Sequence, residues 1–271
     1  MIQDIAPHKY NVQYKQCKPT ENDILLIFKN DEVLVREAEG RVWFPAIGEL
    51  DCEGEVSFLF SMDFTNIFMA ESNKEYEGWH YVNQGYFRQA QPLWKAFAGA
   101  TAIQLKRWYG ENNFCSCCGG KMTRGTQERS LICSACGKTV YPKISPCVIV
   151  ALFDGDRLML TKYNQKHSSY PRYALIAGYN EVGETLEDTV RREVMEEVGL
   201  KVKNITYYKN QPWAFSDTLL MGFFCELDGD DKITRDAEEL AEALWVKREN
   251  IPIYDSRISL TNEMIEKFRN G

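Results

Sequence analysis

The sequence has 271 residues, enough for one large domain or two to three small ones, and its 44% of apolar residues suffices for a packed core. No run approaches the roughly 18 consecutive apolar residues that span a bilayer, and the N-terminus lacks an apolar signal-peptide centre, so cytoplasmic residence without membrane contact is expected. The net charge of −7 argues against broad, nonspecific nucleic-acid binding but leaves a local basic surface open.

The first part of the chain, residues 1–111, is expected to form a β-rich domain with one helix. Three apolar runs have strand character: 23–29, 32–37 and 41–45. The Asn30–Asp31 pair between the first two runs indicates a turn. A helix is expected over 92–109, because Pro92 suits a first helical turn and Gly110 suits a stop. This part carries no evident catalytic constellation, and we interpret it as a structural or dimer-forming domain.

The second part, residues 112–142, carries two CxxC pairs and is expected to be a zinc ribbon. The pairs supply four thiolates: Cys115, Cys118, Cys133 and Cys136. Four sulfur ligands complete the tetrahedral coordination of zinc, which is typical of a structural site. Cys117 could compete as a ligand, although the symmetric spacing favours Cys118. Unliganded cysteines and a redox role are the alternatives.

The ribbon segment is also locally basic. From Cys115 to Lys143, five cations oppose Glu128: Lys121, Arg124, Arg129, Lys138 and Lys143. Such a cluster fits either a solvated face or contact with a polyphosphate or RNA strand.

The third part, residues 143–271, alternates strands with helices. Its strand-like runs are 147–153, 157–163, 173–178, 203–210, 218–227 and 242–247. Asp154-Gly155-Asp156 is a hairpin signal between the first two runs. Helices are expected over 185–200 and 260–269. This order of elements implies an α/β or α+β sandwich.

The helix over 185–200 carries the chemistry. Thr185 can cap it, and Gly199 is well placed to end it. Glu193, Glu196 and Glu197 occupy positions i, i+3 and i+4, so their carboxylates project from one side. Their mutual repulsion favours a hard cation such as Mg²⁺, which binds carboxylates, water and phosphate oxygens. An acidic, solvated helix face is the alternative for the glutamates taken alone.

The surrounding segment resembles the Nudix box, G-x5-E-x7-R-E-U-x-E-E-x-G-U with U apolar. Every fixed position is filled: Gly178, Glu184, Arg192, Glu193, Val194, Glu196, Glu197, Gly199 and Leu200. The resemblance implies an α+β fold, an α/β/α sandwich around a mixed sheet. It also implies hydrolysis of nucleoside diphosphates linked to another moiety.

The same resemblance implies roles for individual residues. Metal ligands, for Mg²⁺ or Mn²⁺, would be Glu193, Glu196, Glu197 and the carbonyl of Ala177. Glu184 would be a supporting carboxylate. By its spacing alone, Arg192, four residues before Glu196, is expected to orient one of the carboxylates through a charge-assisted hydrogen bond. Glu239 would be a further, late-sequence metal ligand, with Glu238 and Glu242 as competitors.

A second motif, residues 210–223, resembles the SQPWPFPxS signature of the Nudix NAD(H) pyrophosphatases, which also remove NAD caps from RNA 5′ ends. Those enzymes carry a four-cysteine ribbon followed by Tyr-Pro, here Tyr141-Pro142. The residues implied to bind substrate are Gln211, Pro212, Trp213, Ala214, Phe215, Ser216, Asp217 and Thr218. Asn210, Ala214, Ser216 and Thr218 depart from the signature, and the lost prolines would make the loop less rigid.

The implied reaction is NAD(H) plus water giving nicotinamide mononucleotide and AMP, with NAD-capped RNA as a second substrate. Trp213, Phe215 and Tyr179 are aromatics able to stack on a base. Glu128 and Tyr141 are further candidates for substrate contact. A homodimer is implied by the resemblance.

Three alternatives stay open. The chain could be a Nudix hydrolase of ADP-ribose or dinucleoside polyphosphates. It could be a non-catalytic nucleotide- or RNA-binding module. It could also be a zinc-ribbon scaffold for protein partners, which predicts no magnesium dependence.

Overall fold

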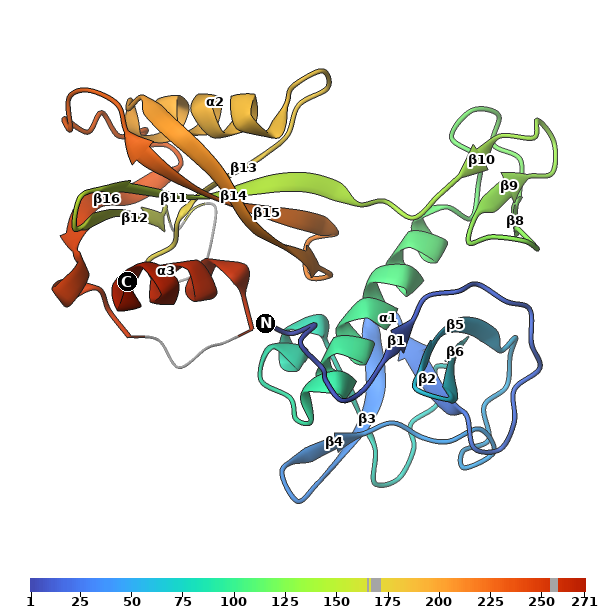
Figure 1. Ribbon diagram of the computed structural model, residues 1–271. Coiled ribbons are helices and arrows are strands. Elements are labelled where there is room, and N and C mark those ends of the chain that lie inside the picture. Colours follow the sequence, from blue (N-terminus) through green and yellow to red (C-terminus); the bar gives the residue numbers. More distant parts are fainter. Residues whose placement is uncertain (165, 167–171, 254–257) are drawn as a thin grey trace. The chain divides into compact units, whose positions relative to one another are not determined.

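Figure 1 shows the protein as a computed structural model that describes residues 1–164, 166, 172–253 and 258–271. The chain forms two compact units. One holds Ile2–Lys143 with Ala214–Asp217, and the other holds Met1, Ile144–Trp213 and Thr218–Gly271. The boundaries expected at 111 and 142 stay predictions.

The unit of Ile2–Lys143 is built on a seven-stranded sheet. Its strands are β1 (Tyr10–Asn11), β2 (Ile24–Lys29), β3 (Glu32–Ala38), β4 (Arg41–Trp43), β5 (Ser57–Met62), β6 (Thr65–Glu71) and β7 (His80–Val82). They pair in the order β1-β5-β6-β2-β3-β4, with β7 on β3, and β2 runs parallel to β6. The expected turn at Asn30–Asp31 joins β2 to β3, with Asn30 in the left-handed region at φ 55°.

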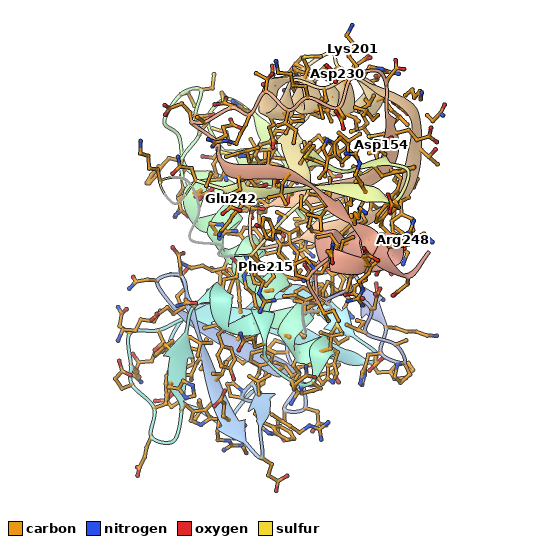
Figure 2. All side chains as sticks on the ribbon, turned by 90° about the vertical axis from the view of Figure 1, so that its left-hand side faces the viewer. Asp154, Lys201, Phe215, Asp230, Glu242 and Arg248 are labelled. Atoms are coloured by element: carbon orange, nitrogen blue, oxygen red, sulfur yellow. The ribbon has the colours of Figure 1, made fainter. Side chains whose placement is uncertain are left out.

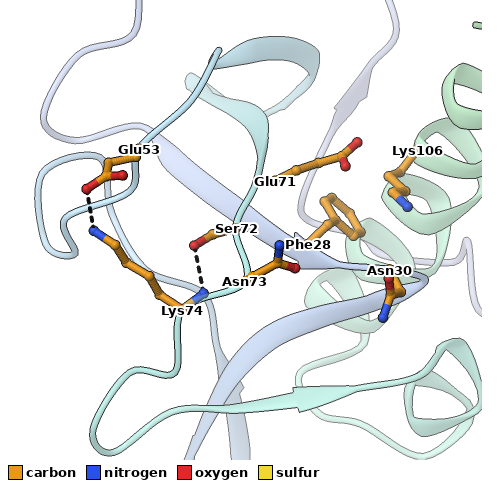
Figure 3. A pocket seen from close by; sticks show the side chains of 8 residues that line it. All are labelled: Phe28, Asn30, Glu53, Glu71, Ser72, Asn73, Lys74 and Lys106. Atoms are coloured by element: carbon orange, nitrogen blue, oxygen red, sulfur yellow. Dashed lines mark hydrogen bonds and ion pairs between the residues drawn. The ribbon is translucent and has the colours of Figure 1, made fainter.

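Two helices complete this part of the unit, η1 (Gln84–Arg88) and α1 (Leu93–Glu111). They pack closely, since a Cβ on Gly99 of α1 would lie 2.4 Å from the Phe87 ring. A cavity of about 670 Å³ opens in this unit (Figure 3). Its lining is mostly polar: Phe28, Asn30, Glu53, Glu71, Ser72, Asn73, Lys74 and Lys106.

The cysteine segment of the same unit folds as a small three-stranded sheet. Its strands are β8 (Met122–Arg124), β9 (Leu131–Cys133) and β10 (Thr139–Val140), paired antiparallel in the order β10-β9-β8. So few residues bury little apolar surface, which leaves the stability of the segment dependent on its cysteines.

The second unit is a six-stranded mixed sheet with helices on both faces (Figure 1). Its elements are β11 (Ser145–Asp154), β12 (Arg157–Tyr163), β13 (Ile176–Tyr179), α2 (Leu186–Val198), β14 (Val202–Trp213), β15 (Thr218–Leu227), β16 (Leu240–Lys247), η2 (Arg248–Asn250) and α3 (Leu260–Asn270). The strand order is β14-β15-β11-β12-β16, with β13 on β11 and with β11 parallel to β15.

Alternation along β11 explains the layers. Val148, Val150 and Leu152 enter the core shared with α2, and Cys147, Ile149 and Ala151 enter the core shared with α3. Successive side chains of a strand point to opposite faces, so a run that is apolar throughout feeds two cores. The expected α/β/α sandwich with a mixed sheet is confirmed.

Several elements differ from expectation, either in their bounds or in being present at all. Strands β5 and β6 were not expected, because the run Ser57–Met62 is buried throughout and lacks a period-two pattern. The strand expected over 173–178 is shorter, since β13 begins at Ile176. Strand β14 extends into the motif over residues 210–223 and ends at Trp213, beyond the strand expected over 203–210. The hairpin expected at 154–156 joins β11 to β12.

Candidate functional site

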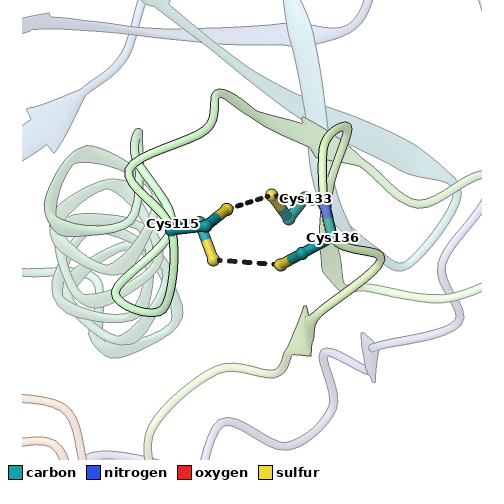
Figure 4. Close-up of side chains that lie close together, drawn as sticks. Cys115, Cys133 and Cys136 are labelled. Atoms are coloured by element: carbon teal, nitrogen blue, oxygen red, sulfur yellow. Dashed lines mark hydrogen bonds between the residues drawn. The ribbon is translucent and has the colours of Figure 1, made fainter.

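The four expected zinc ligands converge. The sulfurs of Cys115, Cys118, Cys133 and Cys136 lie within 4.8 Å of one another. Figure 4 labels Cys115, Cys133 and Cys136 of this set. Cys115 Sγ is 3.7 Å from Cys136 Sγ, and Cys118 Sγ is 3.5 Å from Cys133 Sγ. Cys117, the competing candidate, is exposed and lies outside this set.

The backbone prepares two of these sulfurs as thiolates. Backbone N–H groups of Cys136 and Ala135 lower the pKa of the Cys133 thiol to about 6. The N–H of Cys117, 3.4 Å from Cys115 Sγ, is the main cause that lowers the pKa of Cys115. A thiolate is the form that binds a metal, so the geometry and the local charge both suit a tetrahedral cation.

Helix α2 begins and ends as its sequence predicts. The hydroxyl of Thr185 accepts a hydrogen bond from the N–H of Asp188, and Gly199 ends the helix in the left-handed conformation at φ 70°. Val190, Val194 and Val198 are fully buried on one side. This stripe fixes the rotation of the helix and thereby sets where its glutamates point.

Glu197 is the most buried of the three glutamates, with 2% of its surface exposed. Its Oε1 accepts from the N–H of Ala177 at 3.3 Å, whereas Oε2 has no hydrogen-bond partner within the described part of the chain. Burial raises the pKa of its carboxyl to about 8, and Glu193 and Glu239 add to the effect. An unsatisfied buried carboxylate oxygen is costly, and a bound cation would satisfy it.

Glu193 lies directly against β13. A Cβ on Gly178 would sit 1.8 Å from Glu193 Cδ, so glycine is required for the carboxylate to occupy this place. Burial raises the pKa of the Glu193 carboxyl, and Arg192 opposes that effect. The first glycine of the motif therefore serves to make room for a carboxylate.

Arg192 organises the remaining charges. Its Nε and Nη2 donate to the two oxygens of Glu184 at 2.7 and 3.0 Å. Its Nη1 donates to Glu193 Oε1 at 2.7 Å and to Glu196 Oε2 at 2.9 Å. Nη2 also donates to the carbonyl of Tyr179 at 2.9 Å. The Arg192 guanidinium holds the pKa of Glu184 down at about 2, so Glu184 is fully ionised.

Two residues that we did not expect complete this network. Thr189, which is fully buried, donates to Glu184 Oε2 at 2.9 Å. Asn180 donates to Thr189 Oγ1 at 2.7 Å and to the Glu184 carbonyl at 3.3 Å. Both fall at variable positions of the motif, so its pattern gave no signal for them. They orient Glu184, which in turn orients Arg192.

Glu239 and Glu242, two candidates for the late-sequence metal ligand, have different surroundings. Glu239 is exposed, and its charge raises the pKa of both Glu193 and Glu197 beyond the main effect of burial. Glu242, labelled in Figure 2, instead accepts from the Tyr173 hydroxyl at 2.7 Å and pairs with Lys162 at 3.3 Å. Glu239 as a metal ligand, with Glu238 and Glu242 as competitors, stays a prediction.

The carboxylates are less tightly gathered than the cysteines. Across the residues that the structure describes, no second set of three metal-binding side chains has its ligand atoms within 4.8 Å. Arg192 accounts for part of this, because it already bridges Glu193 and Glu196. A cation here would need Glu196, which is exposed, to turn toward its two buried neighbours.

The signature residues on β14 and β15 differ in exposure. Pro212 is exposed and Trp213 is half-buried, whereas Gln211 is fully buried and Thr218 is 3% exposed. Tyr179, which follows the motif's first glycine, is 52% exposed. Of the two base-stacking candidates in this unit, Tyr179 is thus exposed and Trp213 is partly exposed.

The loop Ala214–Asp217 is part of the unit that holds Ile2–Lys143. Gln84 Nε2 donates to the Ala214 carbonyl at 2.8 Å, and Arg107 Nη2 donates to it at 3.3 Å. Arg107 also forms an ion pair of 2.5 Å with Asp217, whose φ is 56°.

The remaining candidates lie in the same unit. The guanidinium of Arg88 lies 4.2 Å from the centre of the Phe215 ring, and Ser216 is exposed. The Tyr141 hydroxyl donates to Glu128 Oε1 at 2.9 Å, so these two candidates are paired with each other. No sequence signal identified Arg88 as a partner of the loop.

Helices that could cross a membrane are not found among the described residues. A crystal structure of a NUDIX hydrolase from Nitrosomonas europaea aligns with a TM-score of 0.50 and 23% identity, covering 58% of this chain and 90% of that one, which supports the fold.

Curated relatives are more similar to this chain in sequence than that crystal structure is. The protein named NAD-capped RNA hydrolase NudC of Pectobacterium atrosepticum is 38% identical over 164 residues, 60% of this chain and 62% of its own length. The protein of the same name from Photobacterium profundum is 36% identical over 166 residues, 61% of each chain. The match thus spans about three fifths of these relatives.

The family model for the NUDIX domain matches residues 143–267, which include α2, β13 and Glu239. The glutamates that Arg192 and Gly178 position accordingly lie within the residues that match the NUDIX domain model.

Proposed function

We propose that this chain is a divalent-metal-dependent hydrolase that cleaves the diphosphate of NAD(H) into nicotinamide mononucleotide and AMP. The observation that carries the proposal is the buried Oε2 of Glu197, which has no hydrogen-bond partner in the described part of the chain. Glu197 lies on α2 together with Glu193 and Glu196. The relatives named NAD-capped RNA hydrolase, at 38% identity, favour this substrate class and extend it to NAD-capped RNA.

The residues present fit a hard cation. Glu193 and Glu197 are both buried, the charge of Glu193 raises the pKa of Glu197, and the missing side chain of Gly178 leaves room for the Glu193 carboxylate. Glu196, Glu239 and the carbonyl of Ala177 would supplement them. Bound Mg²⁺ or Mn²⁺ would neutralise the diphosphate and lower the pKa of a water molecule.

The chain's own residues would orient the reactants. Arg192 holds the Glu193 carboxylate in place by a hydrogen bond of 2.7 Å, whereas the exposed Glu196 would turn toward its two buried neighbours when a cation binds. Tyr179, half exposed beside the motif's first glycine, offers a ring on which a flat base can stack. Water is added across one P–O bond, and each of the two products keeps one phosphate.

The four cysteines suit Zn²⁺ in a structural role, because four sulfur ligands leave no coordination position for substrate. The proposal also includes a division into 1–111, 112–142 and 143–271, a homodimer, cytoplasmic residence and no role at a membrane. The altered signature loop, with Ala214 and Ser216 in place of prolines, is proposed to contribute to substrate binding together with Thr218.

The test compares hydrolysis of NADH, ADP-ribose and diadenosine polyphosphates, with and without Mg²⁺ or Mn²⁺. We expect NADH to be among the best substrates and hydrolysis to require the metal. Glu197→Gln is expected to abolish turnover, and Glu187→Gln, an exposed position of the same helix, serves as the matched control.

Each alternative has its own result. Little activity on NADH with strong activity on ADP-ribose would indicate another specificity. Binding of NAD-capped RNA without cleavage in the presence of Mg²⁺ would indicate a non-catalytic module. Turnover that is unchanged by Glu197→Gln would refute the role assigned to this helix.

A further inference from the structure

Gln211 belongs to the signature, yet its side chain is fully buried and bonded to the backbone. Its Oε1 accepts from the N–H of Leu260 at 2.7 Å, and its Nε2 donates to the carbonyl of Ile258 at 2.7 Å. Both backbone groups lie at the start of α3. One amide side chain on β14 therefore bridges two residues at the beginning of a helix.

The start of a helix needs such partners, because its first N–H groups lack carbonyls within the helix. Ser259 satisfies one of them by accepting from the N–H of Asn262 at 3.3 Å. Gln211 satisfies another from outside the helix. A carboxylate at this position could only accept and an apolar side chain could do neither, so the bridge requires an amide.

Other contacts fix the same junction. The hydroxyl of Tyr208 and the Nζ of Lys209, both on β14, lie 3.0 and 2.6 Å from Glu263 Oε1 in the first turn of α3. A Cβ on Gly222 would meet Met264 Sδ at 2.7 Å, which shows how closely α3 approaches β15. The first turns of α3 are thus held against two strands.

The bridge bears on the signature through Trp213. Residues 211 and 213 lie two apart on a strand, so their side chains share a face. Trp213 packs against the core cluster that contains Leu260 and Met264 of α3. The placement of this aromatic consequently depends on where α3 begins.

We propose that Gln211 is a positioning residue that fixes the start of α3 to β14, so that Trp213 is held ready for the nucleotide. The inference rests on the proposed function. It assigns to α3 a part in substrate affinity, and it separates Gln211 from the residues that touch substrate.

The test is Gln211→Met, which keeps the length of the side chain and removes both hydrogen bonds. Loss of a hydrogen-bonded bridge of this kind corresponds to about a tenfold change in an equilibrium. We expect the KM for NADH to rise about tenfold, with kcat and the Mg²⁺ concentration for half-activation within about twofold of wild type. Glu263→Gln, which weakens the second tie without burying a new group, should raise KM about twofold. Lys203→Met, at an exposed position of the same strand, is the control.

Hydrogen exchange at the amide of Leu260 gives a readout that is independent of turnover. It should be about tenfold faster in Gln211→Met than in wild type. A fall in kcat with unchanged KM would indicate general damage and overturn the inference, as would an NADH complex in which the Gln211 amide contacts the ligand. Wild-type protein that does not hydrolyse NADH would refute the proposed function, whereas unchanged exchange at Leu260 would refute the bridge itself.

Discussion

Glu197 should oppose the stability of the domain that it serves. The side chain is 2% exposed, and one of its oxygens has no partner in the described chain, so its ionised form is disfavoured in the folded state. Replacing it with glutamine keeps the acceptor for the N–H of Ala177 and removes the charge. We therefore expect Glu197→Gln to abolish turnover and to stabilise the metal-free protein at alkaline pH.

The magnitude follows from the pKa, which burial raises from 4.5 to about 8. Between these values the folded state binds more protons than the unfolded state. The contribution of the protonated Glu197 carboxyl to the free energy of unfolding is therefore fully present below pH 4.5 and is lost as the pH rises toward 8. At pH 8 the ionised carboxyl costs about 4 kcal/mol. An amide N–H₂ without an acceptor offsets about 1 kcal/mol of the gain. The variant should then be more stable than wild type by about 3 kcal/mol at pH 8 and less stable than wild type by up to about 1 kcal/mol at pH 4.5.

The assay is urea-induced unfolding at pH 4.5 and pH 8, and unfolding is monitored by hydrogen exchange in peptides of Ile144–Gly271. Free magnesium and manganese are removed by dialysis without a strong chelator, so that cysteine-bound zinc is kept. Glu187→Gln is again the control, and added Mg²⁺ should narrow the difference by stabilising wild type alone. A variant that is less stable than wild type at pH 8, or equally shifted at both pH values, would refute the electrostatic reasoning.

Three further perturbations test other parts of the molecule. Gly178→Ala places a Cβ 1.8 Å from Glu193 Cδ, so metal-dependent turnover should fall at least about 100-fold while zinc content stays constant; near-normal activity would contradict the packing. Cys133→Ser should lower bound zinc, measured by atomic emission, from one ion per chain to about none, and retention of the ion would disprove four-sulfur ligation. Arg107→Glu and Asp217→Lys should each destabilise their unit by about 1 kcal/mol and should recover about half of that loss when combined; additive losses would show that the ion pair contributes nothing.

The sequence predicts best what depends on residues close together along the chain. The cap at Thr185, the left-handed stop at Gly199 and the contact of Arg192 with Glu196 all follow from spacings of a few residues, and each is observed. The convergence of the four cysteines also follows, because each pair lies on one short turn.

What the sequence does not predict depends on contacts between distant segments. The hydrogen-bond partners of Gln211 are 47 and 49 residues away along the chain, and no local pattern connects them to it. The tie between Arg107 and Asp217 spans 110 residues. Long-range hydrogen bonds of this kind follow from the fold as a whole and not from periodicity.

Helix α2 shows how the two kinds of information combine in one element. Val190, Val194 and Val198 are fully buried, and the same rotation that buries them also buries Glu197. Burial of three valines contributes several kcal/mol, which is about the cost of the ionised Glu197 carboxyl at pH 8. The apolar stripe can thus hold an unsatisfied carboxylate inside the domain until a cation arrives. A helix whose glutamates were all exposed would hold a cation less firmly, because water would compete for every oxygen.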